Sequence, residues 1–185
     1  MAALNWWLPP ATLAERGVCA GWLSLPGSRM AQREAVRREL PVRLAEPFGQ
    51  TSGSLRLVET ETAPRLQGLV GAQWLSLSYA GERIGFALAA RPVGIDLVEV
   101  GALPDWREVA EDFFGPNVTS ELLAHPGHEQ TAAFALAWVE LEARGKALGE
   151  GLAEWDAARA ARLARTELAY RNVADGYAVA LALRG

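Results

Sequence analysis

An acidic residue stands inside an apolar segment at residues 93–99, with the sequence VGIDLVE. If this segment is a β-strand, Asp96 shares one face with Gly94 and Val98, while Glu99 points to the other face. A carboxylate within an apolar sheet is unfavourable unless a metal ion or another cation compensates its charge. Two interpretations follow. Asp96 is a ligand for a hard metal ion, with Gly94 leaving room for a substrate, or it caps a turn at the strand end.

A second chemical pattern lies on a predicted helix over residues 129–148. Trp138, Glu142 and Lys146 are spaced four residues apart, so they form one stripe, with the carboxylate and the ammonium group side by side. Such a pair is commonly an exposed ion pair that contributes little to stability. The alternative is that both charges belong to a functional site.

Strands and helices of familiar pattern surround these two segments. Residues 73–90 predict two strands joined by a tight turn at 79–83, and residues 92–99 predict a third strand. Helices are predicted over 106–114, 118–124 and 129–148, the last one ending at Gly149. Residues 1–28 are apolar and interrupted by prolines, which favours a short strand and turns.

The final predicted strand, 176–182, repeats the pattern of residues 85–90, at a distance of about half the chain. A duplicated α+β unit would leave such a repeat. Residues 30–44 predict a helix with a basic face, formed by Arg33, Arg37, Arg38 and Arg43. That face is either a solvated surface or a binding site for an anion.

Composition excludes several classes of function. The 185 residues, half of them apolar, can bury a substantial core, and 22 acidic against 18 basic side chains give a net charge of −4. This charge argues against a broad surface for nucleic acid or for an anionic membrane. Cys19 is the only cysteine and there are two histidines, so neither a disulfide nor an ordinary zinc cage is expected. With no apolar run long enough for a membrane span and no export signal, we expect a cytoplasmic protein.

The two chemical patterns together resemble the signature of the 4′-phosphopantetheinyl transferase superfamily. The strand acid of that family lies in a Gly-Ile-Asp setting, matched here by 94–96, and its helix motif is matched by Phe134, Trp138, Glu142, Lys146, Gly149, Gly151 and Leu152. The likeness extends over about residues 63–182. Upstream, residues 75–81 resemble a further family strand, with Ser78 retained and Tyr79 where histidine is usual.

The resemblance implies a fold and an architecture. The expected fold is α+β and pseudo-duplicated, like the larger, monomeric, surfactin-synthetase-type members, in which each half is a small antiparallel sheet with a long helix. Residues 1–90 would form the half that contacts coenzyme A, and residues 91–185 the half with the metal and catalytic residues. The site would lie at the boundary between the halves.

The resemblance also implies a reaction and its residues. The enzyme would transfer the 4′-phosphopantetheine group from coenzyme A to a serine of an acyl or peptidyl carrier protein, with Mg²⁺, and release 3′,5′-ADP. Asp96 and Glu142 would hold the metal, Lys146 would stabilise the phosphates, and Glu142 would accept the serine proton. The expected contacts of the coenzyme are Lys146, Ser78, Tyr79, Arg65, Arg38 and Arg29.

Three positions depart from the family pattern. Val98 stands where larger members often carry a second strand carboxylate, Leu141 replaces a lysine, and Tyr79 replaces a histidine. The last two changes remove positive charge that would meet the anionic coenzyme. An alternative function is therefore a catalytically weakened member that binds a carrier protein or coenzyme A as an accessory protein.

Overall fold

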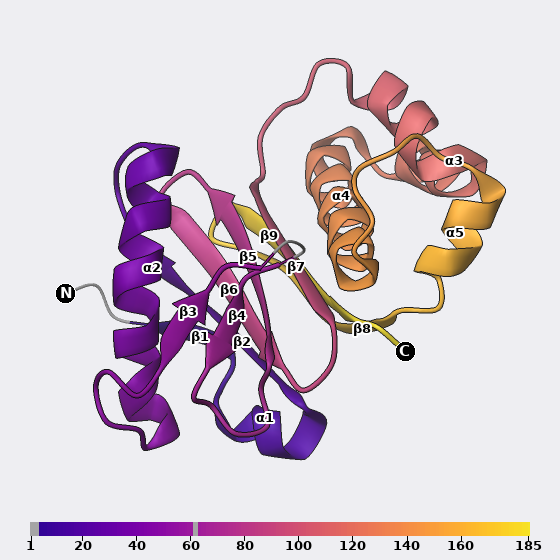
Figure 1. Cartoon of the computed structure of the whole chain (residues 1–185). Coiled ribbons are helices and arrows are strands. Elements are labelled where there is room, and N and C mark those ends of the chain that lie inside the picture. The colour runs from indigo at the N-terminus through magenta and orange to yellow at the C-terminus, as the bar shows by residue number, and fades with distance from the viewer. Residues whose placement is uncertain (1–3, 61–62) are drawn as a thin grey trace. The chain divides into compact units, whose positions relative to one another are not determined.

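The computed structural model describes residues 4–60 and 63–185, and the chain divides into two compact units, Met1–Val93 and Gly94–Gly185. Both units mix helices with antiparallel strands (Figure 1). The fold is therefore α+β, as the sequence predicted.

The first unit is built on a four-stranded sheet in the order β1-β2-β6-β5, and a second, two-stranded sheet pairs β3 with β4. The bounds of its elements are β1 Asn5–Leu8, α1 Ala11–Arg16, β2 Val18–Ser24, α2 Arg29–Ala45, η1 Glu46–Phe48, β3 Arg56–Val58, β4 Arg65–Gln67, β5 Trp74–Ala80 and β6 Arg83–Ala89. The predicted strand pair at 73–90 is confirmed as the β5–β6 hairpin, in which Gly81 and Glu82 make the turn.

The long helix α2 covers one face of that sheet. Val36, Leu40 and Leu44 lie on one side of the helix and pack against buried sheet residues that include Leu75 and Phe86. Ser28 caps the helix start by accepting a hydrogen bond from the amide of Ala31. Of the arginines predicted to form the basic face of α2, Arg33, Arg37 and Arg38 are exposed, whereas the side chain of Arg43 is 9% exposed and pairs with Glu39.

The second unit contains a three-stranded sheet in the order β7-β9-β8 and three helices. The bounds are β7 Val93–Glu99, α3 Trp106–Ala124, α4 Gly127–Leu148, α5 Ala157–Leu163, β8 Glu167–Ala174 and β9 Tyr177–Leu183. The helix α3 is kinked at Gly115, which has a φ of 76° and precedes Pro116, so the two helices predicted at 106–114 and 118–124 are its two arms.

Small side chains let α4 lie close to the sheet of this unit. Ala135, Ala143 and Ala147 of α4 pack against Ala178, Ala180 and Ala182 of β9. On another side, α4 packs against α3 through an aromatic cluster of Trp106, Phe113, Phe114, Phe134 and Trp138. The helix ends at Gly149 in the left-handed conformation, with φ 73°, as the sequence predicted.

Candidate active site

Asp96 lies in the middle of β7, and its partner comes from α4. The ammonium nitrogen Nζ of Lys146 lies 2.7 Å from Oδ1 of Asp96 and donates a second hydrogen bond, of 3.1 Å, to the carbonyl oxygen of Ile95. The interpretation of Asp96 as a cap at the strand end is therefore wrong. Lys146 reaches across to the strand rather than along its own helix, so the interpretation of Glu142 and Lys146 as an ordinary exposed pair does not hold either.

Gly94 makes this contact possible because it lets α4 approach β7 closely. A Cβ atom at position 94 would lie 2.0 Å from the carbonyl oxygen of Ala143 and 2.7 Å from Cβ of Lys146. The space beside Gly94 is filled by the backbone of α4. The expectation that Gly94 leaves room for a substrate is thus wrong: the glycine serves packing between strand and helix.

Glu142 is half-buried on α4, one turn before Lys146. Burial raises the pKa of its carboxyl group above the ordinary value, and the negative charge of Asp96 raises it further, while Lys146 and Arg159 act in the opposite direction. The two carboxylates therefore lie in one electrostatic neighbourhood. The structure brings Lys146 into contact with Asp96, and both charges act on Glu142, so the three residues that the family resemblance grouped lie near one another.

The neighbouring residues of β7 face away from this group or are apolar. Val98 packs with the alanines of α4 and β9. Glu99 is exposed and accepts a hydrogen bond of 3.0 Å from the hydroxyl of Tyr177. The strand alternation that separated Glu99 from Asp96 is confirmed.

The donor set at this position suits Mg²⁺. Over residues 4–60 and 63–185, no cluster of three or more His, Cys, Asp or Glu side chains is arranged to hold a metal ion. Mg²⁺, however, binds through one or two carboxylates and completes its octahedron with water and substrate phosphate oxygens. Asp96 and Glu142 would supply two such carboxylates, so the residues present fit this ion.

A comparison with protein-family models identifies residues 92–181. The model for the 4′-phosphopantetheinyl transferase superfamily matches residues 92–181, a range that contains Asp96, Glu142 and Lys146. Residues 92–181 are a domain of this superfamily. No curated protein matches the chain. In the described part of the chain, no helix has both the length and the apolar character needed to cross a bilayer.

Arg159 is a charged residue of this superfamily domain that the sequence analysis missed. It lies on α5, is 5% exposed, and donates a hydrogen bond of 3.2 Å to the carbonyl oxygen of Gly151. It also approaches the carboxylate of Glu150 and lowers the pKa of Glu142 through its charge. Asp156 caps α5 three residues earlier, but nothing in the spacing of the sequence indicated that Arg159 is buried.

In the first unit, Tyr79 lies beside a stripe of arginines from α2. The guanidinium of Arg29 lies 4.9 Å from the centre of the Tyr79 ring. Burial raises the pKa of the Tyr79 hydroxyl, whereas the charges of Arg33, Arg29 and Arg37 lower it. These arginines are spaced four residues apart and share one side of α2. Arg29 and Tyr79, both predicted to contact the coenzyme, therefore lie close together, and Arg33 and Arg37 add two further positive charges beside them.

The other predicted coenzyme contacts lie elsewhere in the first unit. Ser78 is buried on β5, and by strand alternation its side chain lies on the opposite sheet face from Tyr79. Arg65 stacks on Trp74, with 4.1 Å between the guanidinium carbon and the ring centre. Arg38 is 73% exposed and bonds to the adjacent Glu39.

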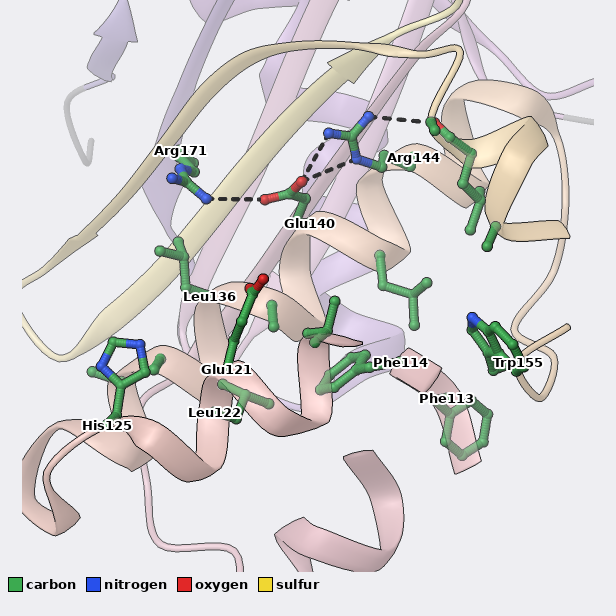
Figure 2. A pocket seen from close by; sticks show the side chains of 18 of the residues that line it. Phe113, Phe114, Glu121, Leu122, His125, Leu136, Glu140, Arg144, Trp155 and Arg171 are labelled. Carbon is green, nitrogen blue, oxygen red and sulfur yellow. Dashed lines mark hydrogen bonds and ion pairs between the residues drawn. The ribbon is translucent and has the colours of Figure 1, made fainter. Parts of the chain in front are cut away.

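A cavity of about 820 Å³ lies between α3, α4, α5 and β8 in the superfamily domain (Figure 2). Along one side, Glu140 bonds to Arg144 at 2.8 Å and to Arg171 at 3.2 Å. Leu141 lines the cavity and packs with the aromatic cluster between α3 and α4. The described residues that line it include Arg159 but not Asp96 or Lys146, so the cavity and the Asp96 site are distinct.

Proposed function

We propose that this chain is an active 4′-phosphopantetheinyl transferase, which moves the phosphopantetheine arm of coenzyme A onto a serine of an acyl or peptidyl carrier protein. The observation that carries this proposal is the contact of Lys146 with Asp96, with Glu142 beside them, inside the domain that matches the superfamily. A carboxylate pair and a lysine at one position are what a reaction on a pyrophosphate requires.

In this reaction the serine hydroxyl oxygen attacks the phosphorus that bears the pantetheine. The bond from that phosphorus to the bridging oxygen breaks, and 3′,5′-ADP leaves with the electron pair. Glu142 accepts the serine proton, directly or through a water molecule. Lys146 stabilises the phosphates of the coenzyme.

Asp96 and Glu142 would hold Mg²⁺, which supplies positive charge where negative charge builds up on the phosphates. Two protein ligands suffice because the pyrophosphate and water provide the others. Val98 adds no ligand, since its side chain packs with alanines.

The first unit is proposed to bind the remainder of coenzyme A. Arg29 and Tyr79, joined by Arg33 and Arg37, form a basic surface suited to a phosphate group. Arg38, Arg65 and Ser78 remain proposed contacts.

We further propose that the two units arose by duplication. The hairpins β5–β6 and β8–β9 each have a two-residue turn, and the sequence repeat falls on β6 and β9. Each of these two strands has a neighbour on both sides in its sheet. We also propose that the chain acts as a monomer in a reducing compartment such as the cytoplasm, which its single thiol suits.

The alternative is an accessory protein that binds a carrier or coenzyme A without transfer. Three positions favour it: Leu141 and Val98 pack in apolar surroundings and add no charge to the site, and Tyr79 stands where histidine is usual in the family. The lysine of the family pattern is absent at position 141, and the carboxylate that larger members often carry is absent at position 98.

Intact-mass spectrometry separates the two functions. The protein is incubated with coenzyme A, Mg²⁺ and a panel of apo acyl and peptidyl carrier proteins, and each carrier is then weighed. We expect at least one carrier to gain the mass of a phosphopantetheine group. If calorimetry shows binding of coenzyme A or a carrier while no carrier gains mass, the accessory function replaces the enzyme.

A further inference from the structure

The ammonium group of Lys146 is held by two oxygens of β7. It bonds to Oδ1 of Asp96 at 2.7 Å and to the carbonyl oxygen of Ile95 at 3.1 Å. The side chain of Asp96 is 11% exposed and that of Lys146 is 32% exposed. A divalent cation that binds Asp96 must therefore compete with a positive group already placed against a largely desolvated carboxylate.

The helix backbone is fixed here, whereas the lysine side chain is not. The backbone of α4 lies against Gly94, so the helix cannot shift closer to the strand, and the aligned alanines of α4 and β9 keep it in place. Lysine carries its charge on a flexible four-carbon stem. The ammonium group can leave Asp96 by rotation of that stem alone.

The charges around the site favour joint binding of a cation and an anion. Asp96 and Glu142 are negative, and Lys146 and Arg159 are the two positive groups that act on Glu142, so the formal charges of these four residues cancel. Addition of a divalent cation alone leaves an uncompensated charge of two in a partly buried place. A pyrophosphate group that enters with the cation restores the balance and offers Lys146 new oxygen acceptors.

We propose that Lys146 makes metal binding depend on the coenzyme. In the coenzyme-free protein the ammonium group of Lys146 bonds to Asp96 and thereby weakens the binding of a divalent cation to that carboxylate. When the coenzyme binds, its pyrophosphate draws Lys146 away, and Asp96 becomes available to the ion. By linkage, metal and coenzyme strengthen each other's binding by the same factor. The inference rests on the proposed function, since it takes the pyrophosphate of coenzyme A as the anion.

Binding of Mn²⁺, followed by electron paramagnetic resonance of the free ion, tests this inference on the full-length chain. Mn²⁺ is titrated into wild type and Lys146→Met, each alone and with coenzyme A, with protein-free coenzyme as the blank. We expect coenzyme A to tighten Mn²⁺ binding to wild type at least about fivefold, which is the lower end of the coupling usually found between two binding sites. We expect Lys146→Met to bind Mn²⁺ without coenzyme at least about fivefold more tightly than wild type, with a smaller effect of coenzyme.

Two controls make the outcome specific. Arg171→Met removes one positive charge from an exposed position of the same unit and should leave Mn²⁺ binding within about twofold of wild type. Lys146→Gln keeps a neutral donor for the Ile95 carbonyl, and it should reproduce the tighter binding if Lys146→Met fails to fold. 3′,5′-ADP, which lacks the pyrophosphate linkage, should not replace coenzyme A.

The inference is overturned if folded Lys146→Met and Lys146→Gln bind Mn²⁺ no more tightly than wild type without coenzyme. Transfer to a carrier is measured separately by mass. If wild type transfers the group to a carrier but the variants bind Mn²⁺ no more tightly than wild type, the role of Lys146 is rejected and the proposed transferase function stands. If the variants bind Mn²⁺ more tightly but wild type modifies no carrier, the transferase function is rejected and the competition between Lys146 and the metal ion for Asp96 stands.

Discussion

Gly94→Ala tests the packing that brings Lys146 to Asp96. The added Cβ would lie 2.0 Å from the carbonyl oxygen of Ala143, 2.6 Å from the amide nitrogen of Ala147 and 2.7 Å from Cβ of Lys146. Two of these atoms belong to the backbone of α4, and the third is fixed to it. None of them can rotate away, so the helix must move from the strand.

The expected cost follows from these contacts. Overpacking of a protein interior costs about 1–3 kcal/mol and sometimes more. Because the clash is with backbone, we expect the upper end, about 3 kcal/mol. Alanine also restricts the unfolded chain, which stabilises by about 0.4–1 kcal/mol and reduces the net loss to about 2–3 kcal/mol. Displacement of α4 should also separate Lys146 from Asp96 and lower the rate of transfer.

Urea unfolding followed by tryptophan fluorescence measures the change in the free energy of unfolding. Gly127→Ala is the matched control, because position 127 is the first residue of α4 and no heavy atom lies within 4 Å of a Cβ there. We expect this control to be as stable as wild type or slightly more stable. Equal stability of Gly94→Ala and Gly127→Ala would refute the close packing of β7 and α4.

Three further predictions concern other parts of the chain. Burial raises the pKa of the Cys19 thiol to about 12, so a chromogenic disulfide reagent should react with it only after unfolding; fast reaction in the folded protein would contradict its burial. Since the pKa of Glu142 is raised in the folded state, the contribution of Glu142 to the free energy of unfolding should fall as pH rises above the ordinary glutamate value. Glu142→Gln should therefore gain stability relative to wild type between about pH 4 and about pH 7, and a pH-independent difference in urea unfolding would argue against the raised pKa. Arg144→Met should lower the free energy of unfolding by about 2–3 kcal/mol, because the Arg144 side chain is 19% exposed and bonds to Thr166 at 2.8 Å and 2.9 Å. Arg171→Met, which changes an exposed side chain, should lower it by less than about 1 kcal/mol. Equal losses in thermal unfolding would be inconsistent with these contacts.

Elements with strong local patterns were predictable from the sequence. Apolar residues recur at helical spacing in α2, the strand β6 is a continuous apolar run after its first residue, and glycines mark the end of α4 and the turn of the β5–β6 hairpin. The strands β3 and β4 were not predicted, since each has only three residues and leaves almost no pattern. The helix α5 and the strand β8 were missed as well. The first is a short, alanine-rich segment, and the second is largely exposed and lacks alternation.

The candidate site was predictable as a set of residues but not as a set of contacts. Strand alternation and helical spacing drew attention to Asp96 and to the pair of Glu142 and Lys146 separately, and the family resemblance joined the three residues into one site. The pairing of Lys146 with Asp96 depends on how closely α4 approaches β7, which is a long-range property set by Gly94 and the alanines of β9. The burial of Arg159 depends on the path of the chain after Gly151, which no local pattern records.

The central claim is that Asp96 is essential to a transfer from coenzyme A to a carrier protein. Its most direct test is the mass of a carrier after incubation with coenzyme A, Mg²⁺ and wild type, Asp96→Asn or Glu99→Gln. Both substitutions remove one negative charge from β7, but Glu99 is exposed on the other strand face. We expect wild type and Glu99→Gln to add one phosphopantetheine group to the carrier and folded Asp96→Asn to add none. Equal transfer by Asp96→Asn, or no transfer by wild type to any carrier, would contradict the central claim.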